Sequence, residues 1–266
     1  MPLLKKIQHI PSGSVYDIHI LESNEMKNQA FALLYRKYIE ESKDPWEFPK
    51  QNPSNLRIEK RVVDGISDVP VLVDDFEHSA FTLGIVDPVS GKVVGTGRML
   101  HREKMPDGKL EIERYNSLPH KFKTVLDKKK CHVEVNRFAI DDDLKGKRSG
   151  LLLYVSILSE LSNVYSMDTI VYTQPLSLFK KTKAPGYSLL VVLNQIQNLG
   201  SFKYNRDDTE PAMVCLASKL AWINLGIIRA LKAGTILIPS RVWWMGAGVI
   251  SESSIQKITH EKPVRI

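Results

Sequence analysis

The chain has 266 residues, 43% hydrophobic and 25% charged, a composition typical of a soluble globular protein with one large or two small domains. Its two cysteines form neither a disulfide framework nor a metal-ligand pattern, so we expect a reducing, cytoplasmic setting and no metal site. Neither a signal peptide nor a membrane-spanning apolar stretch is evident, and the net charge of +7 favours an acidic partner: nucleic acid, an anionic membrane or an acidic protein.

The first 70 residues predict one strand, one helix and a long irregular segment. Residues 1–14 are expected to be a lead-in, and the alternation of apolar and polar residues over 15–21 predicts a strand. Asn24 can cap the helix that follows, which carries an apolar stripe. Residues 44–70 contain four prolines, and we interpret them as an irregular but packed lid.

A β-hairpin is predicted next, with strands over residues 80–87 and 92–100. Gly95 and Gly97 lie inside its second strand, where glycine weakens a strand unless another group approaches the backbone closely. Arg98 follows directly, so the glycines and the arginine together favour a functional site at this end of the strand.

The most informative stretch is 132–140, whose β-branched and aromatic residues predict a buried strand. Glu134 and Arg137 lie inside it, and a buried charge needs a partner or an open cleft. Side chains three apart on a regular strand point to opposite faces, so we predict a bulge that turns both to one side. A purely structural Glu–Arg pair is an equally good interpretation of this stretch alone.

The rest of the chain predicts further helices and strands. Residues 141–150 form a basic loop before a leucine-rich helix, whose amides with Lys145, Lys147 and Arg148 could hold a phosphate, although an ordinary basic loop would look the same. After this helix (151–165) we predict a strand at 169–174, a helix at 175–183, a strand at 187–193, a hydrophobic helix at 211–233, an extended segment at 235–245 and a polar tail at 250–266.

This order of elements resembles the Gcn5-related N-acetyltransferase fold. The resemblance implies an α/β (α+β) protein with a mixed, mainly antiparallel central sheet, flanked by helices and followed by a C-terminal helical extension. We therefore expect an acyltransferase-fold domain over residues 15–200, with residues 201–266 as an extension packed on the same domain.

Four motifs resemble those of the acyl-homoserine lactone synthases and their relatives, the N-acyl amino acid synthases, over roughly residues 15–190. They are Arg36 with Tyr38 and Trp46, the acidic pair Asp74 and Asp75, the strand that ends at Arg98, and Glu134-Val135-Asn136-Arg137-Phe138. Two departures move our first choice to an N-acyl amino acid synthase-like enzyme. The family has two aspartates three apart, whereas His78 stands three residues after Asp75, and this chain continues past the usual end of a lactone synthase.

The resemblance implies transfer of a fatty acyl group from a thioester to the amine of an amino acid. Glu134 would be the general base. A charged network of Arg36, Arg98, Arg137 and Asp75 would shape the site and could bind an amino-acid carboxylate. The implied catalytic residues are Glu134, Arg137, Arg98 and Arg36. The residues implied in substrate binding are Trp46, Asp74, Asp75, Phe138 and Tyr38, and those implied in donor binding are Lys147, Arg148 and Gly150.

No bound cofactor is expected; the co-substrate would be acyl-acyl carrier protein, with its phosphopantetheine thioester, or acyl-coenzyme A. Acyl carrier protein and a small amine are thus the expected partners, a peripheral membrane contact stays open, and no motif supports nucleic-acid binding. Basic residues flank the central strand and the next one, and could form a rim that steers the acidic carrier protein: Lys121, Lys123, Lys128, Lys129, Lys130, Lys145, Lys147, Arg148, Lys180, Lys181 and Lys183. The alternatives are a homoserine-lactone synthase and an inactive acyl-binding module of the same fold.

Overall fold

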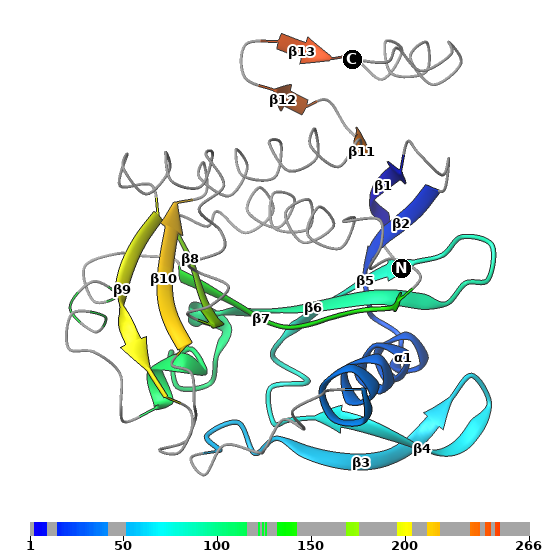
Figure 1. The fold of residues 1–266 in the computed structure, drawn as a ribbon, viewed down its shortest axis with the longest axis horizontal. Helices are drawn as coiled ribbons and strands as arrows, with labels where there is room; N and C mark the ends of the chain where they lie inside the picture. Colours follow the sequence, from blue (N-terminus) through cyan, green and yellow to red (C-terminus); the bar gives the residue numbers. More distant parts are fainter. Residues whose placement is uncertain are drawn as a thin grey trace.

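The computed structural model describes residues 3–9, 15–41, 52–115, 132–142, 169–175, 196–203, 212–218, 235–239, 243–245 and 248–250, with Phe122, Thr124 and Leu126. Nine strands form one sheet in the order β11-β1-β2-β5-β6-β7-β8-β10-β9 (Figure 1). Their bounds are β1 Leu3–His9, β2 Val15–Ile20, β5 Phe81–Val86, β6 Val93–His101, β7 His132–Ile140, β8 Thr169–Pro175, β9 Ile196–Phe202, β10 Ala212–Ser218 and β11 Thr235–Pro239. Within this sheet β7 and β8 pair in parallel and the other neighbours are antiparallel, which confirms the predicted mixed, mainly antiparallel sheet.

Two smaller sheets complete the strands of the described chain. In the first, β3 (Arg57–Val63) pairs with β4 (Ile66–Val73), and in the second β12 (Trp243–Met245) pairs with β13 (Gly248–Ile250). The β3–β4 hairpin closes through Asp64 and Gly65, both with positive φ (52° and 77°), a backbone that suits a two-residue hairpin turn.

Helix α1 (Asn24–Tyr35) lies between the large sheet and the β3–β4 hairpin (Figure 1). It begins one residue earlier than a cap at Asn24 would place it, because the side chain of Ser23 accepts the hydrogen bond from the N–H of Met26 at 3.3 Å. Its buried face, with Phe31 and Leu34, packs into one apolar cluster with the hairpin. The helix continues as the π-helical turn η1 (Arg36–Glu40).

A second apolar cluster lies under the segment between β6 and β7. This segment contains two short 3-10 turns, η2 (Arg102–Lys104) and η3 (Ile112–Arg114). Phe122, Leu126 and Leu110 are completely buried there and pack with Val171 of β8 and Val214 of β10. The first cluster includes Ala139 of β7 and the second includes Leu100 of β6, so each cluster anchors one of these two strands.

The predicted bulge is present in β7. Thr96 pairs with Ala139 and Arg98 with Asn136, so two residues of β7 stand opposite the single residue Gly97. One of those two, Arg137, has a φ of 56°, a left-handed conformation that is uncommon for a residue with a side chain. The glycine is required because a Cβ at position 97 would lie 2.6 Å from Cε1 of Phe138.

The parallel pairing between β7 and β8 is short. It runs from His132 with Thr169 to Val135 with Tyr172 and ends just before the bulge. Beyond Val135 and Tyr172 the two strands no longer pair with each other, and the sheet is open next to Glu134 and Arg137.

Three predicted elements differ from the structure. Residues 1–14 were expected to be a lead-in but contain β1, which pairs with both β2 and β11. Residues 44–70 were expected to be irregular but contain β3 and most of β4, since proline is tolerated in a two-stranded sheet where each strand has a free edge. Residues 212–218 form strand β10 of the central sheet where a helix over 211–233 was expected, so the described part of the predicted C-terminal helical extension is strand instead.

The predicted strands at 15–21, 80–87, 92–100, 132–140 and 169–174 correspond to β2, β5, β6, β7 and β8, and the described parts of the predicted extended segment at 235–245 are β11 and β12. Three further predicted helices or strands lie outside the described residues. These are the helix at 151–165, the helix at 175–183 apart from Pro175, which ends β8, and the strand at 187–193.

We predict that Gly97→Ala lowers the free energy of unfolding by about 1–3 kcal/mol, because the added methyl group overlaps the Phe138 ring. Urea denaturation measures the change. The loss should shrink when Phe138 is also replaced by leucine, and equal losses in both backgrounds would contradict the proposed clash. Gly65→Asn is the control: nothing lies within 4 Å of an added Cβ there, and asparagine tolerates positive φ, so a change below about 0.5 kcal/mol is expected.

Candidate active site

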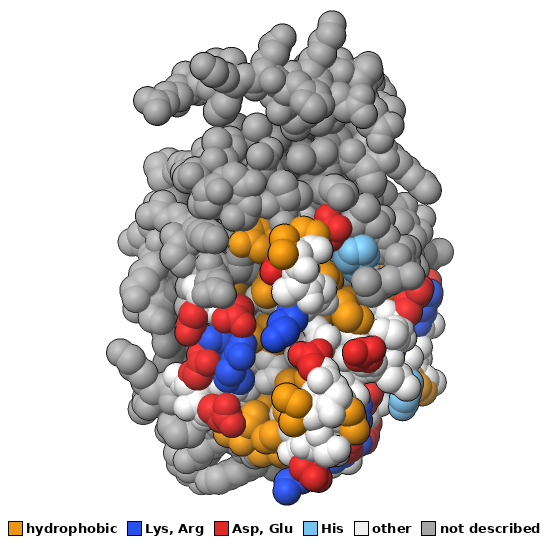
Figure 2. Space-filling model, turned by 90° about the vertical axis from the view of Figure 1, so that its right-hand side faces the viewer, with side chains coloured by type: hydrophobic (Ala, Val, Ile, Leu, Met, Phe, Trp, Pro, Cys, Tyr) orange, Lys and Arg blue, Asp and Glu red, His pale blue; other side chains and the backbone are white. Residues whose placement is uncertain are grey.

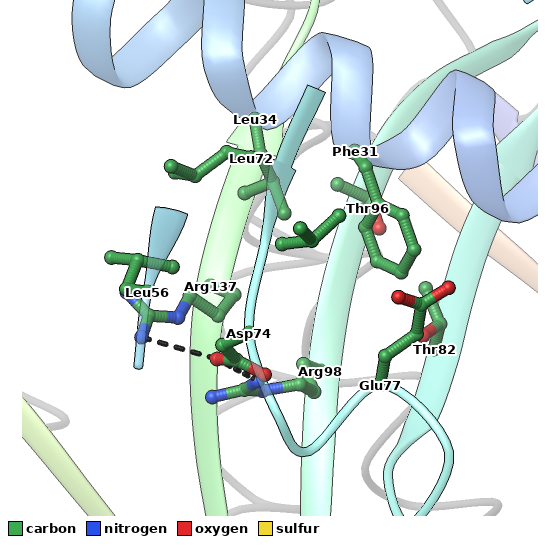
Figure 3. A pocket seen from close by; sticks show the side chains of 11 residues that line it. Phe31, Leu34, Leu56, Leu72, Asp74, Glu77, Thr82, Thr96, Arg98 and Arg137 are labelled. Atoms are coloured by element: carbon green, nitrogen blue, oxygen red, sulfur yellow. Dashed lines mark hydrogen bonds and ion pairs between the residues drawn. The ribbon is translucent and has the colours of Figure 1, made fainter. Parts of the chain in front are cut away.

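Four charged side chains form a buried network at the bulge of β7. Arg98 donates to the carboxylate of Asp74 and, at 2.5 Å, to Oε2 of Glu111. Arg137 donates to the same two carboxylates, at 3.3 Å to Asp74 and 2.9 Å to Glu111. Figure 3 shows the side chains of Asp74, Arg98 and Arg137 converging. Two positive and two negative charges balance, as burial requires.

Each member of the network comes from a different part of the fold. Asp74 directly follows β4, Arg98 lies on β6, Glu111 directly precedes η3, and Arg137 stands at the bulge of β7. Three of them, Asp74, Arg98 and Glu111, are 4–6% exposed. The network therefore links the hairpin, two central strands and the segment between them.

The charges of neighbouring residues determine the protonation states of Asp74 and Arg137. Burial disfavours the charged form of Asp74, but the positive charges of Arg98 and Arg137 outweigh it, so the pKa of Asp74 lies below its usual range. Burial also disfavours the charge on Arg137, yet Glu111 and Asp74 raise the pKa of its guanidinium. Both residues are therefore charged at neutral pH.

Glu134 lies beside this network but accepts hydrogen bonds from neutral groups. Its Oε2 accepts from the N–H of Ile112 at 3.0 Å, and its Oε1 accepts from Nδ2 of Asn136 at 3.0 Å. Burial, followed by the negative charge of Glu111, raises the pKa of Glu134 to about 8. At neutral pH Glu134 is therefore mainly protonated. Its pKa lies close to physiological pH, which suits a group that transfers protons.

A cavity of about 180 Å³ opens beside Glu134, where β7 and β8 cease to pair. Its lining residues are Tyr38, Glu111, Ile112, Tyr115, Glu134, Val135, Asn136, Arg137, Phe138 and Thr173. The hydroxyl of Tyr38 donates to the backbone carbonyl of Phe138 at 2.9 Å, and burial raises the pKa of Tyr38, so it keeps its proton. The cavity thus contains a buried titratable carboxyl group and a distorted strand backbone.

A second cavity, of about 20 Å³, lies between α1 and the network (Figure 3). Phe31, Leu34, Leu56 and Leu72 form its apolar part, and Asp74, Arg98 and Arg137 form its charged part. Its volume corresponds to one water molecule.

The structure brings together most of the predicted site residues that it describes. Glu134, Arg98, Arg137 and Asp74 lie in or beside the network, and Tyr38 and Phe138 line the larger cavity. Trp46, Lys147, Arg148 and Gly150 lie outside the described residues, as do the eleven basic residues of the predicted rim.

Two predicted members of the network lie elsewhere. The side chain of Asp75 is 59% exposed and pairs with Arg57 at 2.8 Å, because consecutive residues after β4 point in different directions. Arg36 is 42% exposed and pairs with Asp141 at 2.6 Å and Glu41 at 3.4 Å. Asp74 and Glu111 take the places that were assigned to these two residues.

Sequence reasoning missed Glu111 and misplaced the acidic pair. Glu111 lies in a polar segment with no recognisable pattern, so no local signal marked it. The acidic pair was counted from Asp75, but counting from the buried Asp74 places Glu77 three residues later. Glu77 lines the smaller cavity and pairs with Arg61 at 2.7 Å, so the spacing expected of the family is present with glutamate in the second place.

Within the described residues, His, Cys, Asp and Glu side chains do not gather in threes around a point that could hold a metal ion. None of the described helices has the length and apolar character needed to cross a membrane.

No protein-family model matches this sequence, and no curated protein sequence matches it. Solved structures do match. The CoA-dependent acyl-homoserine lactone synthase BjaI, solved with SAM and isopentyl-CoA, is 13% identical, with a TM-score of 0.50 over 87% of this chain and 89% of that one. FeeM, an N-acyl amino acid synthase from uncultured soil microbes, is 16% identical, with a TM-score of 0.43 over 78% and 92% of the two chains. The ribosomal-protein-S5-alanine acetyltransferase of Vibrio fischeri is 12% identical, with a TM-score of 0.39 over 78% and 94%. The likeness to BjaI, together with the mixed sheet, shows that this chain has the Gcn5-related N-acetyltransferase fold.

Proposed function

We propose that this protein is an N-acyltransferase that moves a fatty acyl group from an acyl thioester to the amine of an amino acid, giving an N-acyl amino acid. The observation that carries the proposal is the position of Glu134. It is a protonatable carboxyl group held by neutral donors, in a cavity at the opening between two central strands.

The reaction needs a neutral amine, because a protonated amine has no lone pair to attack the thioester carbon. The ionised form of Glu134 would accept the proton from the amine, directly or through a water molecule. As the new carbon–nitrogen bond forms, the carbon–sulfur bond of the thioester breaks, and the donor leaves as a thiolate that takes up a proton to give the free thiol. No cysteine or serine is found among the described residues that line the cavity, so direct transfer to the amine is simpler than a covalent enzyme intermediate.

The bulge would supply the electrophilic half of the reaction. The left-handed conformation of Arg137 interrupts the regular ladder between β6 and β7. In the proposed reaction, backbone amides around Arg137 and Phe138 would polarise the thioester carbonyl and stabilise the negative charge that develops on its oxygen.

A homoserine-lactone synthase remains the second candidate, because the structure favours it on one point. The acidic pair at Asp74 and Glu77 has the three-residue spacing of that family, which removes one of the two departures noted in the sequence. The second acidic residue is a glutamate where that family has an aspartate, and this difference in residue type keeps the N-acyl amino acid synthase as our first choice.

The described side chains on one face of the molecule give no support for nucleic-acid binding. On the face drawn in Figure 2, the basic side chains lie among acidic ones instead of forming a field of one sign. Among the ion pairs of the described residues, Arg57 and Arg61 both pair with Glu59.

We predict that organic extracts of cells producing the protein contain fatty N-acyl amino acids, detectable by mass spectrometry. A Glu134→Ala variant provides the matched control and should lose the product. Extracts that contain only acyl-homoserine lactones would decide for the second candidate, and extracts with no new amide would favour the inactive acyl-binding module.

We predict that Glu134→Gln lowers kcat at least about tenfold, because glutamine has a similar shape but cannot accept the proton. The wild-type kcat should rise as the pH increases through about 8, where Glu134 loses its proton, and the variant should lack this rise. The stability loss should stay within about 1.5 kcal/mol, the contribution of one hydrogen bond. Full activity in the variant would mean that Glu134 is not the general base and has only a structural role.

We predict that the donor is an acyl carrier protein guided by basic residues that flank β7 and β8, which are neighbours in the sheet. Its KM should increase with salt, because screening weakens the attraction between exposed charges beyond about 8 Å at physiological ionic strength. A Lys128→Ala, Lys129→Ala, Lys130→Ala variant should start from a higher KM with a flatter salt dependence. BjaI is a CoA-dependent synthase, so acyl-coenzyme A is the comparison donor. Equal use of both donors, or identical salt curves, would exclude the guiding role.

A further inference from the structure

Glu111 and Glu134 are joined through a single amide group. Nδ2 of Asn136 donates one hydrogen bond to Oε2 of Glu111 at 2.9 Å and another to Oε1 of Glu134 at 3.0 Å. These two bonds use both hydrogens of the amide. Oδ1 of the same amide accepts from Nε of Arg98 at 2.8 Å, so the orientation of Asn136 is fixed.

The segment that carries Glu111 also contacts Glu134 through its backbone. The N–H of Ile112 donates to Oε2 of Glu134 at 3.0 Å. Two consecutive residues therefore hold Glu134, one through its side chain by way of Asn136 and the other through its amide. Any displacement of Glu111 would move both contacts together.

Glu111 is itself held tightly. Arg98 and Arg137 donate to its two oxygens at 2.5 Å and 2.9 Å, and the residue is 4% exposed. With Asp74 it balances the two arginines, so a further negative charge on Glu134 would have no positive charge of its own.

We propose that Glu111 is a positioning residue, which fixes the orientation of Glu134 in the cavity and, by its negative charge, holds the proton on Glu134 in the resting protein. The proposal rests on the function proposed above, in which Glu134 is the base. It means that the site starts with its base protonated, and that this proton must pass to solvent before Glu134 can accept one from the amine.

The other groups around Glu134 act in both directions. Burial is the largest contribution to its raised pKa and Glu111 the second, whereas the N–H of Ile112, Arg98 and Asn136 lower it. Tyr38 from η1 and Tyr115 also line the cavity, and Thr173 on β8 is uncharged. Since burial persists in every variant, removal of the Glu111 charge should cancel only part of the shift.

The test is a ¹³C NMR titration of the glutamate carboxyl carbons in the full chain, with Glu134→Gln to assign the signal. In Glu111→Gln the proton affinity of Glu134 should fall about tenfold or more, which is one pKa unit. The control is Glu113→Gln: this residue lies in the same segment but pairs with Arg102 at 2.8 Å, so the titration of Glu134 should not change.

Glu111→Asp provides a second variant that keeps the charge for both arginines, and its effect should have the same sign but a smaller size. An unchanged titration of Glu134 in both Glu111 variants would overturn the proposal. The acid limb of the kcat profile should move with the NMR value. Because the titration needs no turnover, a lowered pKa in a protein that makes no amide would refute the proposed function while the electrostatic role of Glu111 stood.

Discussion

Arg98 donates at once to Asp74 and Glu111, and this double contact joins three parts of the chain that are separate in sequence. Arg137 repeats the arrangement from the neighbouring strand. Loss of one partner would leave an uncompensated charge in the interior, which costs about 3–5 kcal/mol in comparable buried pairs. The network therefore both shapes the site and stabilises the fold. Burial, followed by the negative charge of the neighbouring Glu111, raises the pKa of Glu134 beside it.

The bulge of β7 makes this arrangement compatible with a sheet. On a regular strand Arg137 would point away from Glu134 and could not reach the carboxylates that Arg98 reaches. The extra residue turns it, and Gly97 on β6 leaves the space that the Phe138 ring then fills. The end of the β7–β8 pairing at Val135 adds the opening. The bulge and the end of the β7–β8 pairing thus lie close together along β7, and both adjoin the cavity that Glu134 and Arg137 line.

Much of this could be predicted from sequence, for identifiable physical reasons. Strands with one polar face, such as β2 (Val15–Ile20), alternate and are easily recognised. The bulge was predictable from Glu134 and Arg137, because charged side chains three residues apart would point to opposite faces of a regular strand. The segment Ala212–Ser218 was predicted to be helical because its sequence, AMVCLAS, is a nearly continuous apolar run without the alternation that marks a strand with one polar face. Pro70 obscured β4, although it lies where a free edge tolerates it. Glu111 could not be found at all, since only the folded chain brings it to Arg98.

The conformation of Arg137 has a consequence for how such sequences can change. Its φ of 56° favours glycine or asparagine by about 1–2 kcal/mol, yet only a long cationic side chain can reach both carboxylates from this position. Replacement of Arg137 by glycine or asparagine would relieve the backbone strain but would also remove the positive charge. Position 97 can accept a side chain only where the aromatic residue at position 138 is replaced by a smaller one. Positions 97, 137 and 138 should therefore covary among related chains. Their covariation would identify the bulge even in sequences with low overall identity.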